Sequence, residues 1–260
     1  MCLLVLAWMS HPRYRLVVAA NRDEFHERPA APLGWWGHDT GILAGRDLAA
    51  GGTWMGVTRT GRFGAVTNFR EFEHLPAPDA PSRGELVPRF LGDEADPRHF
   101  VERLHSTSGR YAGFNLLAGG TRSLHFVSNR GDSRPRQLAP GVYGLANHEL
   151  DAPWPKVVAT RARFEAELGR DEPDPAAFFD LLADRVPVAE SSGTAGGLPP
   201  ELVRAMSSPF VVHPRYGTRC STVLMASHAG RTVMIERRYD SAGHQTGATR
   251  VEFAGTAPDE

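Results

Sequence analysis

Cys2 is the residue whose position most directly suggests chemistry. Initiator methionine is normally removed when the second residue is small, and its removal would leave a thiol and a free α-amine on Cys2. The α-amine has a pKa of about 7.7–8.0, so at neutral pH part of it is unprotonated and can accept the thiol proton. The sequence therefore predicts an N-terminal nucleophile. The alternative is that Cys2 is a small apolar residue that begins a strand.

Four consecutive polar residues, Asn21-Arg22-Asp23-Glu24, form the second candidate feature and are called the tetrad below. They directly follow the apolar run Tyr14 to Ala20, which we expect to pair with Cys2 to Trp8 as an antiparallel hairpin. In that hairpin the tetrad lies at the mouth of the sheet, beside Cys2. The alternative is a solvated turn with a local ion pair.

Other polar residues stand where strands are expected to begin or end. Asn68 ends a strand, where its amide could donate to an oxyanion, although an isolated Asn in such a place is usually a turn former. Asn147 and Arg219 have the same two interpretations. Gly51-Gly52-Thr53-Trp54 could let the backbone approach a ligand or simply lead into a strand. No metal site is expected, because the eleven histidines show no metal-ligand spacing and no HExxH or CxxC occurs.

Composition excludes several classes of protein. The chain has 260 residues, 41% hydrophobic and 23% charged, with a formal net charge of -1. These values are typical of a globular protein and give no electrostatic basis for binding nucleic acid or an anionic membrane. The apolar start is too short to span a bilayer and lacks a basic leader, so we expect a cytoplasmic protein without a membrane span. Lys156 is the single lysine, which we attribute to codon bias.

Periodicity and turn residues predict one domain, 1–260, of the α+β class with layered sheets and helices. The segment Asn21 to Gly52 is expected to be a long irregular stretch, and Ser191 to Pro200 a flexible loop. Helices are predicted over Gly84–Leu91, Pro97–His105, Pro155–Leu168 and Pro175–Ala183. Further strands are predicted over Thr53–Thr58, Phe63–Asn68, Phe114–Ala118, Leu124–Ser128, Val142–Ala146, Phe210–His213, Ser221–Ala226, Thr232–Arg237 and Thr249–Phe253.

Taken together, these motifs resemble the NRDE family, which is named for the tetrad and whose animal members are called transport and Golgi organisation protein 2. The similarity begins with Met1-Cys2 and the tetrad and covers nearly the whole chain. Its further blocks are Gly51-Gly52-Thr53-Trp54-Met55-Gly56, Ala65-Val66-Thr67-Asn68, Ser82-Arg83-Gly84-Glu85-Leu86-Val87, Gly113-Phe114-Asn115-Leu116, Asn129-Arg130-Gly131, Tyr143-Gly144-Leu145-Ala146-Asn147 and Tyr216-Gly217-Thr218-Arg219.

The family in turn is similar to the cysteine N-terminal-nucleophile hydrolases, the penicillin V acylase and bile salt hydrolase group. This resemblance implies a four-layer αββα sandwich and attack by Cys2 on a carbonyl carbon after loss of Met1. It implies that Arg22 steadies the thiolate and Asp23 holds the α-amino group. Asn68 and Asn147 then match oxyanion and amine-orienting positions, and Arg219 completes the charged rim.

We further expect four residues near these positions, Asn21, Glu24, Trp54 and Arg83, to contact the substrate or ligand. Glu24 has no counterpart in the hydrolases, which leaves room for a different chemistry.

Two functions follow from the resemblance. The first is a cysteine amidohydrolase that cleaves a small-molecule, non-peptide amide through an acyl-enzyme and requires no cofactor. The second is a carrier for haem or for an acyl-CoA-like or lipid-like ligand, because family members have been linked to haem trafficking and to lipid homeostasis. On that alternative, Trp35-Trp36, Trp54 and arginines such as Arg22 and Arg46 would contact rings and carboxylates. An interaction protein without a small-molecule role is a third option, disfavoured by the cost of burying the tetrad.

Overall fold

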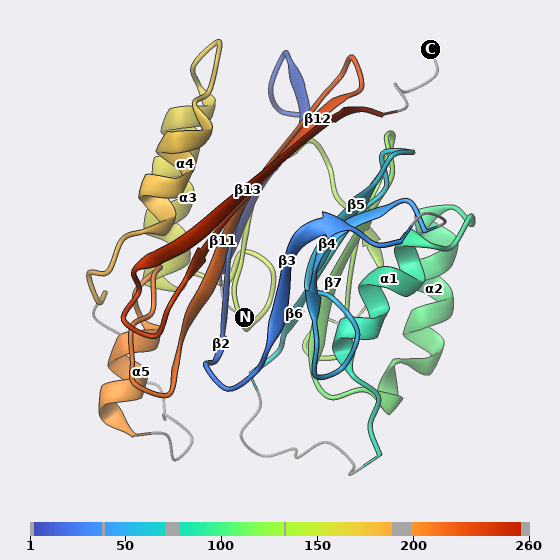
Figure 1. Cartoon of the computed structure of the whole chain (residues 1–260). Helices are drawn as coiled ribbons and strands as arrows, with labels where there is room; N and C mark the ends of the chain where they lie inside the picture. Colours follow the sequence, from blue (N-terminus) through green and yellow to red (C-terminus); the bar gives the residue numbers. More distant parts are fainter. Residues whose placement is uncertain (1–2, 38–39, 71–78, 133, 189–198, 256–260) are drawn as a thin grey trace.

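The computed structural model describes residues 3–37, 40–70, 79–132, 134–188 and 199–255, which form two large antiparallel sheets with helices outside them (Figure 1). The six-stranded sheet has the order β10-β1-β2-β11-β12-β13, with bounds β10 Gly141–Leu145, β1 Leu3–Trp8, β2 Tyr14–Phe25, β11 Tyr216–Ser227, β12 Arg231–Tyr239 and β13 Gln245–Ala254. The seven-stranded sheet runs β3-β4-β5-β6-β7-β8-β9, with bounds β3 Ala30–Trp35, β4 Ile42–Asp47, β5 Met55–Thr58, β6 Phe63–Asn68, β7 Phe114–Gly119, β8 Leu124–Ser128 and β9 Arg136–Gln137.

The helices pack on the outer faces of the two sheets. Helices α3 (Pro155–Leu168) and α4 (Pro175–Leu182) contact the six-stranded sheet, and α1 (Leu86–Leu91) and α2 (Pro97–Thr107) contact the seven-stranded one (Figure 1). Asp174 caps α4 by accepting the Ala176 N–H at 2.8 Å, with proline at the first helical position. Helix α5 (Pro200–Met206) follows later in the chain. Within the described residues, no helix combines the length and apolar character needed to cross a bilayer.

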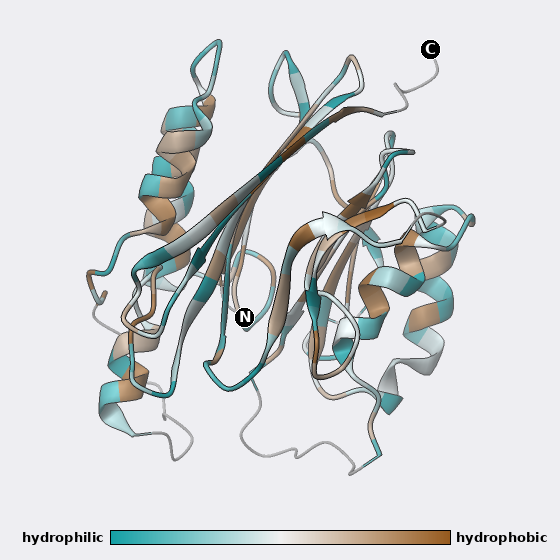
Figure 2. Ribbon diagram, viewed as in Figure 1, coloured by the Kyte–Doolittle hydropathy of each residue, from teal (hydrophilic) through white to brown (hydrophobic). Residues whose placement is uncertain are grey.

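Strand alternation divides the buried residues between an inner and an outer core. Leu4, Leu6 and Leu16 point inward and pack with residues of the seven-stranded sheet such as Met55 and Phe63. The intervening residues of β1 and β2 face the other way and pack on α3 and α4, while α1 and α2 cover a third cluster. Brown and teal both occur along the helices in Figure 2, as expected when one side of each is buried. This alternation, with period two, also determines where each residue of the tetrad points.

Most predicted elements are confirmed, and one helix, α3, has the predicted bounds. The first hairpin is confirmed by pairs such as Leu4 with Ala20, and the second by Met55 with Ala65. The predicted helix over Gly84–Leu91 is a 3-10 turn (Arg83–Glu85) followed by α1. The expected flexible loop falls mostly on residues 189–198, which lie outside the described residues.

Two expectations about secondary structure were wrong, and one helix was not expected. The stretch from Asn21 to Gly52 contains the end of β2 and both β3 and β4. Its prolines and glycines conceal β3 because this is an edge strand whose pairing with β4 shifts register between Ala31 and Gly34. The segment Phe210–His213 forms no strand, since among the described residues its hydrogen bonds to β11 are limited to those between Val211 and Thr218. Helix α5 was not predicted.

Candidate functional site

The tetrad does not follow a strand, as the sequence suggested, but belongs to one. Strand β2 continues to Phe25, and its last residues pair with β11, Asp23 lying opposite Thr218. Strand alternation therefore separates the tetrad into two pairs. Arg22 contacts Asp47 of β4 and Trp54 just before β5, whereas Asn21 bonds to a residue of α4. The tetrad thus places polar side chains on both faces of the sheet.

On the inner face, Arg22 is the centre of a charged cluster. Its guanidinium stacks on the Trp54 ring with 4.5 Å from Cζ to the ring centroid. Arg22 Nη2 lies 3.8 Å from Asp47 Oδ2 and 3.9 Å from Glu24 Oε2, while Arg28 Nε lies 2.7 Å from the same Asp47 oxygen. Only 5% of the Arg22 side chain is exposed. Because Arg28 is the closer partner of Asp47, Arg22 is held near two carboxylates without a short ion pair to either.

One nitrogen of Arg22 has no hydrogen bond. Nη1 is buried and has no partner among the described residues. A buried guanidinium N–H without a partner is costly, since water would otherwise satisfy it. Arg22 therefore offers an available donor inside the protein.

A first hollow of about 90 Å³ opens beside this cluster. Three of the predicted site residues, Trp54, Asn68 and Arg83, line it together with Arg22 and Glu24. Burial lowers the pKa of Arg83, and Glu24 opposes that shift; the Arg83 guanidinium donates to the Gly113 carbonyl at 2.9 Å. Its remaining lining residues are Arg28, Asp47, Thr53, Val66, Ser82 and Gly84.

A second hollow, of about 130 Å³, lies on the other side of Arg22 and Trp54, which line both. Arg219 lines it and is held by the Tyr239 carbonyl at 3.0 Å and by His26 Nδ1 at 3.2 Å. The predicted charged rim at Arg219 is therefore near Arg22, but in this second hollow. Its other lining residues are Ala30, Ala31, Cys220, Glu236, Arg238, Tyr239 and Thr246.

Asp23 occupies the outer face of β2, away from the charged cluster. Its Oδ1 accepts a hydrogen bond of 2.7 Å from Thr218 Oγ1. Burial raises the pKa of Asp23, and the cation of Lys156 is the leading group that opposes this shift. Lys156 is itself buried in the first turn of α3 and donates to the Met206 carbonyl at 2.7 Å. The single lysine of the chain thus acts on the tetrad electrostatically.

Asn21 shares this outer face but makes structural contacts. Its amide nitrogen donates to the carbonyls of Leu182 and Pro209, each at 2.9 Å, and its oxygen accepts from Ser221 Oγ at 2.6 Å. These bonds tie the end of α4 to the sheet. Contact of Asn21 with a ligand stays a prediction.

Asn68 and Asn147 lie together where the two sheets meet. Asn147 Nδ2 donates to the Asn68 carbonyl at 3.0 Å, and Thr67 Oγ1 donates to the Ala146 carbonyl at 3.1 Å. These bonds join the end of β6 to the residues that follow β10. The topology thus brings together two residues that are 79 positions apart in the sequence.

Cys2 lies outside the described residues, so its predicted contacts stay predictions. The next residue, Leu3, pairs with Asn21 of the tetrad. The chain therefore enters the sheet at the tetrad, as the predicted hairpin requires.

Sequence reasoning missed several residues of this site. Asp47 was placed in an irregular stretch, and Glu236 and Cys220 stand in strands that gave no sign of function. Cys220 is buried, and burial raises the pKa of its thiol well above the ordinary value. Lys156 did give a signal, because it is a single lysine among 29 basic residues, but we attributed it to codon bias.

Comparison with known proteins confirms the family resemblance. The family model described as Transport and Golgi organisation 2 matches residues 1–241. The chain is 34% identical over 259 residues to the Transport and Golgi organization protein 2 homolog of Bos taurus, covering 91% of this chain and 92% of that protein. The Homo sapiens homolog is 32% identical over 265 residues, with the same two coverages of 91% and 92%.

A solved structure has a similar fold. The Caenorhabditis elegans N-acylethanolamine-hydrolyzing acid amidase ortholog superimposes with a TM-score of 0.51 and 10% sequence identity. The superposition covers 86% of this chain and 92% of that one. At this identity the likeness concerns the fold alone.

Proposed function

This chain belongs to the Transport and Golgi organisation 2 family, and from that premise we propose that it is a cysteine amidohydrolase that cleaves a non-peptide amide through Cys2. The observation that carries the proposal is the position of Arg22. This buried cation lines a hollow that Asn68 also lines, at the end of the sheet where Leu3 pairs with the tetrad. A thiolate and an oxyanion are the charges that such a donor stabilises.

The proposed reaction runs through a thioester. The α-amine of Cys2 takes the thiol proton, and the thiolate attacks the amide carbonyl carbon. The tetrahedral intermediate collapses with cleavage of the carbon–nitrogen bond, and the α-ammonium returns the proton to the departing amine. Water then gives a proton to the α-amine and attacks the thioester carbonyl, which releases a carboxylic acid and restores the thiol. Arg22 would stabilise the thiolate, and the amides of Asn68 and Asn147 would act on the oxyanion or orient the amine.

The order of the layers supports this assignment. Two sheets face each other with helices on both outer faces, and we interpret this as the four-layer αββα sandwich of the N-terminal-nucleophile hydrolases (Figure 1). The solved structure of similar fold is described as an N-acylethanolamine-hydrolyzing acid amidase. Acyl amides are therefore the first substrates to screen.

The test combines an intact mass with two altered proteins, the Cys2→Ala variant and a protein with a cleavable N-terminal extension. Mass spectrometry of untagged protein should show loss of Met1. Cys2→Ala should abolish both turnover and burst-phase acylation on an acyl amide. A protease-cleavable N-terminal extension should block turnover until cleavage leaves Cys2 first in the chain, which provides a control with an unchanged fold. Retention of Met1, or full turnover by Cys2→Ala, would contradict the proposal.

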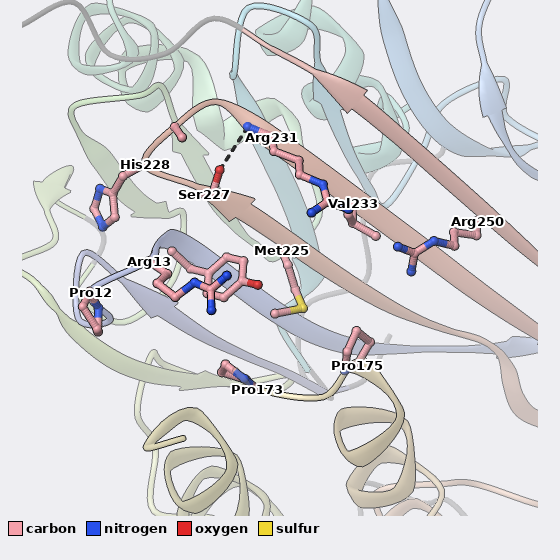
Figure 3. Close-up of a pocket in the computed structure, with 12 residues that line it drawn as sticks. Pro12, Arg13, Pro173, Pro175, Met225, Ser227, His228, Arg231, Val233 and Arg250 are labelled. Carbon is pink, nitrogen blue, oxygen red and sulfur yellow. Dashed lines mark hydrogen bonds between the residues drawn. The ribbon is translucent and has the colours of Figure 1, made fainter. Parts of the chain in front are cut away.

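A different hollow favours a second candidate, the carrier of haem or of an acyl-CoA-like ligand. It has a volume of about 610 Å³, within the usual range of about 300–1,000 Å³ for ligand pockets, and we call it the far hollow (Figure 3). Met225 and Val233 provide apolar surface, and Arg13, Arg231 and Arg250 provide positive charge. Titration with haem should then give a saturable spectral change, and its absence would eliminate haem as the cargo.

A further inference from the structure

The second hollow is lined by more positive than negative charge. Three arginines, Arg22, Arg219 and Arg238, line it with a single carboxylate, Glu236. That carboxylate is buried and already has partners, since it accepts from the Leu33 N–H at 3.0 Å and from Arg238 Nη1 at 3.2 Å. Glu236 and Arg238 therefore offset each other, and the lining of this hollow holds no second carboxylate for Arg22 and Arg219.

Among the described residues, neither of these two arginines has a carboxylate oxygen closer than 3.8 Å. Within the described residues, Arg219 forms no ion pair, and its Nη1 is bonded only to His26 Nδ1 and the Tyr239 carbonyl. Arg22 has carboxylate oxygens no closer than 3.8 Å, both on the side of the first hollow. Its Nη1 is buried without a hydrogen bond among the described residues. Arg219, which has no ion pair among the described residues, and Arg22, whose Nη1 lacks a bond there, therefore border one small cavity.

The size and charge of the cavity select the ligand. A volume of about 130 Å³ is well below the usual range of about 300–1,000 Å³ for ligand pockets, so the cavity suits one small group of a ligand and not a whole ligand. Arginine binds planar carboxylates through paired N–H donors, which suits a group of this size.

We infer that the second hollow binds a carboxylate group of the ligand, between Arg22 and Arg219. This inference rests on the proposed function in one respect: the substrate is then an amide that carries a carboxylate a few atoms from the scissile bond. Arg22 and Trp54 form the wall between the two hollows, so one molecule can present its amide to the first hollow and its carboxylate to the second. The chain should discriminate strongly against neutral analogues, because they would leave the buried Nη1 of Arg22 without an anionic partner.

Calorimetric titration of the Cys2→Ala variant with butyrate tests the subsite without any turnover. Butyrate should bind saturably, and butyramide, which has the same shape but no charge, should bind at least tenfold more weakly. Equal affinity for the two, or no binding of butyrate, would overturn the inference. Inorganic phosphate is the third probe, and tighter binding of phosphate than of butyrate would also overturn it.

Variants then locate the binding site. Arg219→Gln should weaken butyrate binding at least tenfold. Arg237→Gln is the matched control, because Arg237 follows on β12 from the paired Glu236, stacks on Phe179 instead of lining the hollow, and should change the affinity less than twofold. Thr246→Glu adds a carboxylate at an exposed position of the lining and should weaken binding even if Arg219→Gln does not fold. Unchanged affinity in Thr246→Glu and in a folded Arg219→Gln would place the anion elsewhere.

The two proposals fail in different ways. A chain that binds butyrate but hydrolyses no amide would contradict the proposed function and leave the carboxylate subsite intact. A chain that hydrolyses neutral amides as fast as their carboxylate-bearing analogues would keep the proposed function and overturn the subsite. The comparison requires only matched amide pairs and the titration above.

Discussion

Arginine side chains are exposed at one end of the six-stranded sheet and buried at the other. At the far hollow, Arg13, Arg231 and Arg250 have side chains that are 53%, 66% and 51% exposed, and each pairs with Glu172 or Glu252. At the tetrad, eight residues or about 26 Å along β2 from Tyr14, the Arg22 side chain is 5% exposed and lies no closer than 3.8 Å to any carboxylate oxygen of the described residues. The end at the far hollow thus has ordinary surface ion pairs, whereas the end at the tetrad has a buried charge.

This difference indicates where function is to be sought. Exposed ion pairs cost little and stabilise little, so the arginines of the far hollow need no functional explanation. A buried cation with an unbonded N–H lowers stability and is retained where a ligand or a transition state uses it. The buried and incompletely hydrogen-bonded Arg22, and not the volume of a hollow, therefore identifies the tetrad end as the candidate active site.

The largest effect is expected when the buried cation is removed. Arg22→Met should lower turnover by about 10²–10³-fold, the usual loss when one preorganised donor is deleted. Stability should change little, because Arg28 still pairs with Asp47 at 2.7 Å and a methionine fills the space beside Trp54. Arg22→Lys keeps the charge but not the planar stack and should recover part of the rate. If Arg22→Met turned over substrate about as fast as the parent, the buried arginine at the tetrad would be no more functional than the exposed arginines at the far hollow.

The outer face of the tetrad should respond to pH. Burial raises the folded-state pKa of Asp23 above its unfolded value, so its contribution to stability is fully present below about pH 3.8 and is lost as pH rises through the folded-state pKa. Asp23→Asn resembles the protonated form and should gain stability relative to the parent as pH rises from 4 to 8. Urea unfolding across this range measures the difference; a constant difference would show that Asp23 does not titrate there.

Lys156 provides the matching test. Lys156→Met removes the cation that opposes the shift and the bond to the Met206 carbonyl, and should cost about 1.5–3 kcal/mol at neutral pH. Part of this loss should disappear in the double variant with Asp23→Asn, because no buried carboxylate then lacks its cation. Additive effects of the two substitutions would mean that Lys156 does not act through Asp23.

The sequence predicted the apolar framework of the site better than its charges. Alternation identified the hairpin of β1 and β2 and brought the tetrad to the N-terminal residues, as the pair Leu3 and Asn21 confirms. It did not reveal that the tetrad continues the strand, because polar residues in a strand are stable only when distant partners compensate them. Those partners include Thr218, which is 195 positions from Asp23, and no local pattern announces a contact at that separation.

A smaller effect should follow from crowding Trp54. A methyl group on Gly45 would lie 2.5 Å from the Trp54 ring and 3.3 Å from Glu236 Oε2, so Gly45→Ala must displace the wall between the two hollows. We expect a loss of about 1–3 kcal/mol in unfolding free energy and weaker binding of butyrate. Gly34→Ala on β3 is the control, since its methyl group would meet only the Pro32 carbonyl at 3.9 Å. If both variants unfold alike, the cost of Gly45→Ala does not arise from Trp54.

The smallest effect should come from the far hollow. Arg250 is half-exposed and shares Glu252 with Arg231, so Arg250→Met removes one of two cations from an exposed carboxylate. Such a change should leave amide turnover and the urea midpoint within experimental error. The same variant separates the two candidate functions, because a carrier that uses the far hollow would lose affinity for an anionic cargo while Arg22→Met would not. If Arg250→Met slowed turnover as much as Arg22→Met does, burial would no longer distinguish the functional end of the sheet.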